Sequence, residues 1–513
     1  MARILHGTVV TIEQAASAAA GAPSGALNIP FSMDMVPDFK KFDFLFPDLQ
    51  NDPNNLLPES PQTVADLKRL GATMLDDSPA DELNSPVPAV FTYLGQFIDH
   101  DITFEVTSGD LTTINDPNLA PLSLADIKSK IRNTRSATLD LDSLYEGLAP
   151  RDGEKMSVGT VTALNGTNPP LSRPAGKDDN NDLPRRPRST DPATDREALI
   201  GDPRNDENTI VSQLHTAFLR AHNAIVDQGK DFVAARKLLR QHYQWIVLHD
   251  FLPKICDPKI VEDVIYANKV YKPEEAYFFM PLEFTAAAYR FGHTMIRAQY
   301  DFNLNFNLTQ APGTFAASLE LLFTFTALTG ELGDNDTLPD NWIVEWERFI
   351  ENSNGVNFAR RFDTKLVEPL FTLRNFQGQP LPDEARLAVR NLLRGYLLRM
   401  PTGQAVATKL GFSPLTADDL KTAAAYAEQA TALEETGFDT KTPLWYYILA
   451  EAAHIGGDHL GPVGSTIVAE VLVGLIRRSE DSILADASFK PTLGSQPGKF
   501  EIADLLRLAG VIT

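Results

Sequence analysis

The sequence contains almost no cysteine. Cys256 is the single one among 513 residues, which excludes an internal disulfide framework and a cysteine-rich zinc module. Long hydrophobic runs are missing as well, because none approaches the roughly 20 apolar residues that a membrane-spanning helix needs. The first residues carry Arg3 and His6 but no unbroken apolar core. We therefore expect neither a signal peptide nor a membrane span, and a cytoplasmic location by default, with non-classical secretion as the alternative.

Positive charge is in short supply. Lys and Arg number 46 against 68 Asp and Glu, which gives a formal net charge of −22. A surface that acidic repels phosphate backbones, so we do not expect nucleic acid as a partner. The sequence also lacks the GxxxxGK[ST], HExxH, GxSxG and CxxCH signatures. Nucleotide-binding P-loops, common zinc proteases, serine hydrolases and c-type haem attachment are thereby disfavoured, while the sequence leaves the oligomeric state open.

The remaining composition is that of an ordinary globular protein. Apolar residues make up 43% of the chain and charged residues 22%. Helical spacings dominate, and alternating strand patterns are few and short. We predict a mainly α fold, with one large domain over 61–475 that has a helical core, long loops and few strands. An extended N-terminal arm over 1–60 and a C-terminal extension over 476–513 are expected to pack on this core.

Individual helices are predicted where apolar residues recur at spacings of three and four. The predicted helices are 208–227 closed by Gly229, a segment from Pro382 to Gly395, 416–436 closed by Gly437, and 464–477. The segment 172–197 has almost no apolar residue, so we expect it to form a surface loop.

A polar cluster interrupts the apolar helix predicted over 91–101. Gln96 and His100 are four residues apart and so share one helical face, with Asp99 beside them. Asp101 is rotated about 100° from His100 and faces elsewhere. Two interpretations stay open at this point: a helix end with a solvated acidic turn, or a proton-handling histidine whose neighbour Asp101 serves a different site.

A second group of candidates stands just before the helix at 208–227. Arg204 lies where loop packing can hold a cation out of water, and Glu207 directly precedes the helix. His215 and His222 are seven residues apart on one helical face, a spacing that could bind a metal. Because nothing nearby supplies further ligands, we interpret both as buried structural histidines.

A third group surrounds His293. Small residues lead up to it, and Gly292 permits the close approach of a flat group. A lone histidine on such a helix is usually a satisfied core residue, but an axial haem ligand needs the same apolar, closely approachable face. Asn391 and Arg394, near the end of the helix predicted before Gly395, indicate by themselves only an exposed or capping face.

One loop places oxygen-bearing side chains at alternate positions, namely Ser136, Thr138, Asp140 and Asp142. An extended loop of this kind can turn side-chain and backbone oxygens towards one hard cation, as calcium requires. A solvated acidic loop is the alternative.

In their types, order and spacing, these segments together resemble the animal-type haem peroxidase family, part of the peroxidase–cyclooxygenase superfamily. The matching elements are the distal-histidine signature at 95–101, the distal arginine and nearby glutamate at Arg204 and Glu207, the proximal-histidine helix at 289–293, and its supporting Asn391. The resemblance covers roughly residues 85–475. It implies the helical peroxidase fold, built around haem.

The resemblance implies a haem b enzyme that reduces hydrogen peroxide and oxidises small organic donors, with halides or thiocyanate as further candidates. His293 would bind the haem iron, and Asn391 would accept a hydrogen bond from the other ring nitrogen. His100 would transfer the peroxide proton, and Arg204 would stabilise the negative charge that develops as the O–O bond breaks. Gln96 would hydrogen-bond distal water or a halide.

Further residues acquire roles through the resemblance alone. Asp99 and Glu207 match the positions that can link haem through ester bonds. Arg290 and Arg394 would pair with the haem propionates. The implied calcium site comprises Asp101, Ser136, Thr138 through its carbonyl, Asp140 and Asp142. A cation bound there would fix the distal helix, because one ligand adjoins the distal histidine.

The sequence also departs from family patterns. Asn208 follows Glu207 where some members have a methionine that forms a third haem link, so that link cannot form here. Fatty-acid dioxygenases of the superfamily carry a radical-forming tyrosine three residues before the proximal histidine, and Arg290 holds that position. Tyr289 is one residue off and is expected to face away by about 100°. Peroxidase is therefore the preferred function, the dioxygenase is the alternative, and a haem-lacking adhesion module is disfavoured.

Overall fold

The computed structural model of the chain describes residues 10–11, 41–76, 83–107, 111, 113–136, 138–147, 149–164, 172–272, 278–308, 314–350, 356–372 and 386–513. Most of the arm predicted over 1–60 lies outside the described residues, as does the helix start predicted at Pro382. Within the described ranges, every helix is too short or too polar to span a lipid bilayer.

The described chain is mainly helical, as predicted. The α-helices are α2 (Pro61–Ala72), α3 (Val90–Ile102), α4 (Leu124–Lys130), α5 (Asp142–Tyr145), α6 (Thr209–Asp227), α7 (Phe232–Ile246), α8 (Leu252–Ile255), α9 (Pro258–Tyr266), α10 (Leu282–Thr285), α11 (Leu319–Thr324), α12 (Glu368–Phe371), α13 (Leu387–Leu397), α14 (Gly403–Leu410), α15 (Ala417–Ala423), α16 (Ala427–Thr436), α17 (Leu444–His454), α18 (Pro462–Arg478) and α19 (Ile502–Leu508). The 3₁₀ helices are η3 (Pro47–Asn51), η4 (Pro53–Asn55), η6 (Pro203–Asp206), η8 (Ala288–Met295), η9 (Glu331–Asp334), η10 (Asp340–Trp342) and η11 (Trp346–Arg348), and η7 (Val247–Phe251) is a π-helical turn.

The strands are short. They are β1 (Val10–Thr11), β2 (Lys41–Asp43), β3 (Leu75–Asp76), β4 (Asn84–Pro88), β5 (Glu105–Thr107), β6 (Ile131–Asn133), β7 (Arg151–Asp152), β8 (Lys155–Met156), β9 (Phe279–Pro281), β10 (Gln299–Tyr300), β11 (Ala317–Ser318), β12 (Phe358–Arg360) and β13 (Leu366–Val367). The largest sheet of the described residues has the order β1-β5-β6-β2-β9, with β5 and β6 antiparallel and β2 and β9 parallel. Strand β5 follows α3, which carries His100, and strand β9 precedes α10 and η8, which carries His293. The sheet therefore connects the two parts of the chain that carry the candidate histidines.

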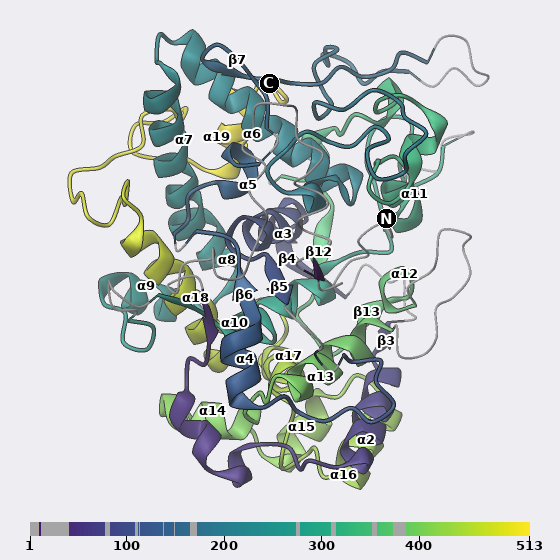
Figure 1. Cartoon of the computed structure of the whole chain (residues 1–513), viewed down its shortest axis with the longest axis vertical. Coiled ribbons are helices and arrows are strands. Elements are labelled where there is room, and N and C mark those ends of the chain that lie inside the picture. Colours follow the sequence, from purple (N-terminus) through teal and green to yellow (C-terminus); the bar gives the residue numbers. More distant parts are fainter. Residues whose placement is uncertain are drawn as a thin grey trace.

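Helix α3 lies near the centre of the molecule (Figure 1). Helices α6 and α7 pack on one side of it, while α2 and the group from α13 to α17 form the opposite end. Phe97 of α3 stacks on Phe218 of α6, with ring centroids 4.5 Å apart and planes within 2° of parallel. Since both rings are fully buried, this contact fixes how α3 sits against α6.

The helix predicted at 208–227 is confirmed as α6. Asn208 caps it by accepting a hydrogen bond from the Val211 backbone N–H at 3.0 Å, and Gly229 follows its end with φ +88°. The helix predicted at 464–477 is confirmed as α18.

Two helix predictions were wrong in detail. The pattern at 416–436 forms two helices, α15 and α16, because the buried Gln429 side chain accepts the Ala425 N–H at 2.9 Å and stabilises the break. Gly437 does end the second helix, with φ +73°. Gly395 does not end α13, which continues to Leu397.

Helices α2 and α13 approach each other unusually closely. A Cβ at Gly71 would lie 2.8 Å from Val389 Cγ2 and 3.0 Å from the Val389 backbone, so only glycine fits there. This contact holds α13, which carries Asn391, against the rest of the helical group.

The segment 172–197 is not simply a surface loop, because its middle is buried. The Arg185 guanidinium donates to Asp182 at 2.8 Å and to Asp206 at 2.7 Å, and all three side chains are at most 3% exposed. Pairing of the charges allows so polar a sequence to enter the interior. Asp206 belongs to η6, so this buried network also anchors the turn that carries Arg204.

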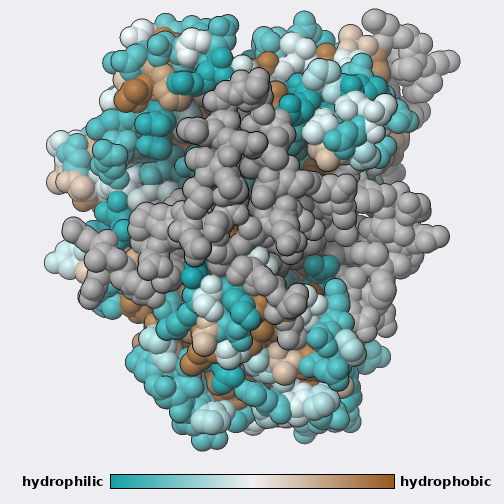
Figure 2. All heavy atoms as spheres, viewed as in Figure 1, coloured by the Kyte–Doolittle hydropathy of each residue, from teal (hydrophilic) through white to brown (hydrophobic). Residues whose placement is uncertain are grey.

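The described part of the face in Figure 2 is mostly hydrophilic. Hydrophobic residues on it occur in small separate groups rather than in one patch. The described residues on this face therefore form no single large apolar patch.

Candidate active site

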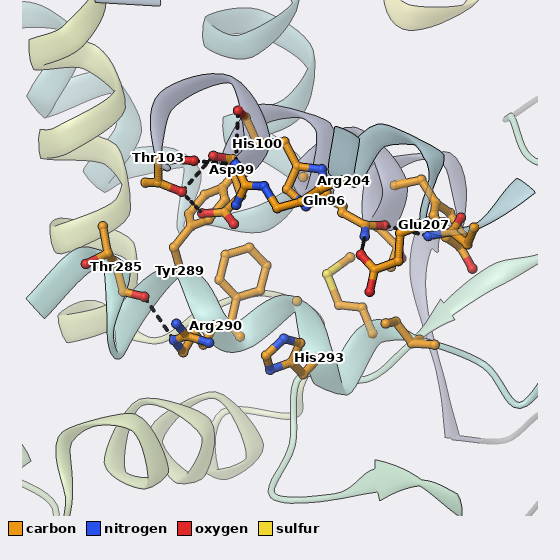
Figure 3. A pocket seen from close by; sticks show the side chains of 18 of the residues that line it. Gln96, Asp99, His100, Thr103, Arg204, Glu207, Thr285, Tyr289, Arg290 and His293 are labelled. Carbon is orange, nitrogen blue, oxygen red and sulfur yellow. Dashed lines mark hydrogen bonds between the residues drawn. The ribbon is translucent and has the colours of Figure 1, made fainter. Parts of the chain in front are cut away.

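One pocket brings together candidate residues from segments far apart in the chain. Gln96, Asp99 and His100 come from α3, Arg204 from η6 with Glu207 just after it, and Arg290 and His293 from η8. His100 and His293 lie on opposite sides of the pocket (Figure 3). The pocket opens to solvent, and the two imidazoles stand on its facing walls.

His100 is held from behind by a hydrogen-bonded chain. Its Nδ1 donates to the Asn205 side-chain oxygen at 2.8 Å, and the Asn205 amide nitrogen donates to His215 Nδ1 at 3.0 Å. Burial lowers the pKa of His100, and the nearby Arg204 cation lowers it further. The ring is therefore neutral at neutral pH, with Nε2 available as a proton acceptor. The sequence had indicated no role for Asn205 and only a structural one for His215.

Arg204 is oriented by Asp202. Its guanidinium donates to Asp202 Oδ1 at 3.0 Å and Oδ2 at 2.7 Å, and also to the main-chain carbonyls of His100 and Thr103. Burial lowers the pKa of Arg204, but the ion pair with Asp202 outweighs this and raises the pKa overall. The cation is thus permanent and is fixed to the last turn of α3, beside His100. Asp202, which sequence reasoning missed, is two residues upstream and fully buried.

Gln96 is held between two neighbours. Its amide nitrogen donates to Glu207 Oε2 at 3.1 Å, and its oxygen accepts from Asn208 Nδ2 at 3.0 Å. Asn208, at the position where some family members have methionine, therefore orients Gln96. Glu207 and Asp99 both line the pocket, and Asp99 accepts the Thr103 hydroxyl hydrogen at 3.0 Å.

The predicted contact between His293 and Asn391 is present, but the amide has the opposite orientation. Asn391 Nδ2 donates to His293 Nδ1 at 2.9 Å, whereas the sequence predicted that Asn391 would accept. The reason is Arg290, whose guanidinium donates to the Asn391 oxygen at 3.3 Å and so competes for the acceptor.

The two arginines expected near propionates differ in their surroundings. Arg290 donates to the Thr285 carbonyl at 3.0 Å, and burial lowers the pKa of Arg290. The Thr285 carbonyl and the Asn391 amide oxygen, to which it donates, are both neutral, so the Arg290 cation remains available to an anion in the pocket. Arg394 lines the same pocket but is ion-paired with Glu105.

Tyr289 does not face away from the site. It lines the pocket and reaches from η8 towards Asp99 on the opposite side (Figure 3). Burial strongly raises the pKa of Tyr289, and its hydroxyl has no hydrogen-bond partner among the described residues. A rotation of about 100° or more separates Tyr289 from Arg290, but it does not turn Tyr289 out of the pocket, because both side chains line it.

The loop predicted to bind calcium lies against α3. Asp101 accepts the backbone N–H groups of Leu141 and Ser143, each at 3.2 Å. Burial and the neighbouring Asp142 carboxylate raise the pKa of Asp101 to about 8. Asp142 in turn accepts the Ser136 N–H at 2.6 Å. The carboxylates of Asp101 and Asp142 therefore lie close enough to repel each other.

Other oxygens of this loop already have partners. Asp140 accepts from the hydroxyls of Thr138 and Ser479. Within the described ranges, no group of three or more His, Cys, Asp or Glu side chains is arranged to hold a metal ion. The calcium site therefore stays a prediction.

Sequence comparison connects this geometry to a family. Residues 128–326 match the model of the animal haem peroxidase family, a range that contains Arg204, Glu207 and His293. This part of the chain is similar to the animal haem peroxidase family, as the sequence analysis predicted. Haem is the cofactor that the similarity implies.

Curated relatives match over limited segments. The chain is 33% identical to the peroxidasin homolog pxn-2 of Caenorhabditis elegans over 123 residues, which are 22% of this chain and 9% of that protein. It is 29% identical to thyroid peroxidase of Mus musculus over 108 residues, or 19% of this chain and 12% of that protein. The matches thus span a small part of these relatives.

Solved structures share the fold over most of the chain. Peroxidase A from Dictyostelium discoideum has a TM-score of 0.58 at 16% identity, covering 89% of this chain and 90% of that one. Fatty acid alpha-dioxygenase from Arabidopsis thaliana has a TM-score of 0.53 at 14% identity, covering 82% and 70%. At such identities the likeness shows the helical peroxidase fold alone.

The residues present fit a haem. Gly292 lies next to His293, and a Cβ built on it would meet nothing within 4 Å, so this wall is open to a flat group. The Arg290 guanidinium, which lines the pocket and donates to neutral partners, suits an anionic propionate. An apolar pocket with a few convergent polar groups is typical of cofactor sites.

Proposed function

We propose that the protein is a haem peroxidase that reduces hydrogen peroxide and oxidises small organic donors. The observation that carries the proposal is the pairing of His100 and His293 across one pocket, with Arg204 on the His100 side. His293 would hold the haem iron, and Arg290 would hold a propionate. When bound, haem would supply the redox chemistry that transfers oxidising equivalents from peroxide to the donor.

His100 would act as the acid–base group. Its Nε2 accepts a proton from the peroxide and returns it to the departing oxygen, a role typically worth roughly 10²–10⁴-fold in rate. The low pKa of His100 supports this role, because the ring is neutral before it accepts the proton. Arg204 would stabilise the negative charge that develops on the departing oxygen. The hydrogen bonds from Arg204 to Asp202 hold the guanidinium in place, so the side chain needs little reorganisation as this charge develops.

Gln96 would hydrogen-bond water or a halide in the pocket. Halides or thiocyanate are candidate donors besides small organic molecules. The bonds that Gln96 makes to Glu207 and Asn208 would limit its reach, so we expect weaker halide use than organic donor use.

Two further proposals concern the cofactors. Asp99 and Glu207 would form ester links to haem, and their position on the pocket wall supports this. We also propose calcium at Asp101, Ser136, Thr138, Asp140 and Asp142. The raised pKa of Asp101 supports it, because a divalent cation would relieve the repulsion between converging carboxylates.

A dioxygenase acting on fatty acids is the second candidate function. Tyr289 favours it, because this tyrosine stands on the pocket wall instead of facing away. The peroxidase remains preferred, since Arg290 occupies the position three residues before His293.

The decisive test is the hemin-reconstituted protein mixed with hydrogen peroxide, followed at the Soret band and by oxidation of a phenolic dye with and without bromide. We expect His100→Ala to keep haem and to react with peroxide roughly 10²–10⁴-fold more slowly. His293→Ala should lose or weaken haem binding. A normal peroxide rate in His100→Ala would refute the assignment.

The alternative is tested by oxygen uptake with a long-chain fatty acid. Uptake by the unmodified protein that disappears in Tyr289→Phe, but not in the control Tyr396→Phe outside the pocket, would favour the dioxygenase. We expect no uptake.

A further inference from the structure

A buried chain of three side chains leads away from the pocket behind His100. It runs from His100 Nδ1 to the Asn205 amide at 2.8 Å, and from that amide to His215 Nδ1 at 3.0 Å. His100 is 3% exposed, and Asn205 and His215 are fully buried. None of the three polar groups can therefore exchange its partner for bulk water.

The Asn205 side chain links the protonation of the two rings. An amide has a donor end and an acceptor end, so it can receive a hydrogen from one imidazole only while donating to the other. With its oxygen towards His100, as observed, His100 carries its hydrogen on Nδ1 and presents the Nε2 lone pair to the pocket. A reversed amide would place the hydrogen on Nε2, and the ring could not accept a proton from a substrate.

We propose that Asn205, oriented by His215, is a positioning residue that holds His100 in the Nδ1–H tautomer and so makes Nε2 the proton acceptor of the pocket. This inference rests on the proposed acid–base role of His100.

The surroundings are compatible with the observed orientation, although it leaves the buried Nε2–H of His215 without a hydrogen-bond partner among the described residues. Burial lowers the pKa of His215 to about 3, so the ring is neutral and one of its two nitrogens can accept the Asn205 hydrogen. Its ring packs edge-on against Phe97 of α3, with centroids 5.9 Å apart, which limits ring rotation. On the pocket side, the Arg204 cation favours a lone pair over an N–H group on the facing nitrogen of His100.

Asn205 is tied to the same turn as Arg204. Both belong to η6, and the next residue, Asp206, is anchored by Arg185 at 2.7 Å. The turn therefore sets two features together: the cation at the pocket and the tautomer of the histidine beside it.

The tautomer can be observed directly in the full-length haem-free protein labelled with [¹⁵N]histidine. Long-range ¹H–¹⁵N correlations should show His100 protonated at Nδ1 and His215 at Nε2. In Asn205→Asp, both carboxylate oxygens accept, so His100 should keep its tautomer while His215 changes to Nδ1–H. In Asn205→Leu, His100 should lose the fixed Nδ1–H signal.

Cyanide binding to the haem-loaded protein gives a second measurement that is independent of turnover. Hydrogen cyanide must lose a proton to bind as the anion, so its association rate reports an available acceptor nitrogen. We expect Asn205→Leu to slow association by between about 10-fold and 10⁴-fold, the range for a misplaced general base or a wrong imidazole tautomer. Asn205→Asp should stay within about 3-fold of the unmodified protein, because the Nδ1–H acceptor is retained.

Two substitutions of His215 form a matched pair, one that keeps a hydrogen-bond acceptor and one that removes it. His215→Asn, whose side-chain oxygen can replace the Nδ1 acceptor, should restore most of the cyanide rate that His215→Leu loses. The control is His222→Leu on the same helix, where the buried ring bonds Tyr145 and the Glu154 carbonyl instead. This control should lower stability without slowing cyanide binding.

The outcomes separate this inference from the proposed function. A His100 ring found in the Nε2–H form, or an equal loss in Asn205→Asp and Asn205→Leu, would overturn the positioning role even if peroxide is still reduced. A normal peroxide rate in His100→Ala would overturn the proposed function even if the tautomer is as stated.

Discussion

Asp202 binds the Arg204 guanidinium with both carboxylate oxygens, at 3.0 Å to Nε and 2.7 Å to Nη2, beneath the last turn of α3. The same carboxylate is ion-paired with the buried Arg135, so one anion is shared by two cations. Burial raises the pKa of Asp202, but the two arginines outweigh it and hold the pKa well below its usual range.

We predict that Asp202→Asn destabilises the protein and slows peroxide reduction. The change leaves two arginines without their counter-charge, and breaking a buried pair costs about 3–5 kcal/mol. Unfolding in urea and stopped-flow kinetics measure the two effects. Asp178→Asn is the control, because its ion pair with Arg220 leaves the carboxylate 53% exposed. Asp178→Asn should lower the free energy of unfolding by at most about 1 kcal/mol. Equal stability of the two variants would contradict the role of Asp202.

Asn391→Leu should weaken haem binding by about 10- to 100-fold, the usual effect of losing the partner of a metal-bound histidine. Hemin titration at the Soret band gives the affinity. We also expect haem binding to reverse the Asn391 amide, because iron binding at Nε2 requires a hydrogen on His293 Nδ1 and a propionate would draw Arg290 away. Unchanged affinity in Asn391→Leu would show that this contact does not support the iron ligand.

Removing calcium should destabilise the protein, and Asp101→Asn should abolish that dependence. A ligand at 100 times its dissociation constant adds about 2.7 kcal/mol to the stability of the folded state. Melting temperatures with calcium and with a chelator test this. Asp227→Asn, at a carboxylate 63% exposed, serves as the control and should keep the calcium effect. If the unmodified protein melts at the same temperature in both buffers, no calcium is bound.

Stability should fall between about pH 4.5 and pH 7 because of Glu283. Burial raises the pKa of Glu283 to about 7, although the Leu45 and Phe46 N–H groups bond its carboxylate at 2.7 and 3.1 Å. The folded state therefore binds the proton more tightly than the unfolded chain, so the contribution of Glu283 to stability is fully present below pH 4.5 and is lost as pH rises through 7. The loss is at most about 3 kcal/mol.

Glu283→Gln should flatten part of this dependence in melting curves taken across the range. Glu451 provides the comparison, since burial raises its pKa to about 7 as well. Glu451→Gln should remove a similar part of the pH dependence of stability. The double variant should remove the contributions of both carboxyl groups. An unaltered pH profile in Glu283→Gln would show that its carboxyl is not the group responsible.

The sequence predicted best where local pattern and local structure coincide. Helix α3 forms as its apolar stripe indicates, and Gln96 and His100 share its pocket-facing side. The sequence predictions failed where tertiary packing decided the outcome. Tyr289 lines the pocket together with Arg290, and the buried Gln429 side chain splits the helix predicted at 416–436.

By itself, the sequence determined the helical class of the fold and which residue types could form a haem site, because helical periodicity and motif order are properties of neighbouring residues. Only the tertiary structure decided which atoms of those residues meet. Asn205 joins His100 to His215, Asp202 orients Arg204, and the Asn391 amide turns its oxygen towards Arg290. These choices depend on buried donors and acceptors contributed by distant segments, and hydrogen-bond direction in the interior is set by competition among partners that no local pattern contains.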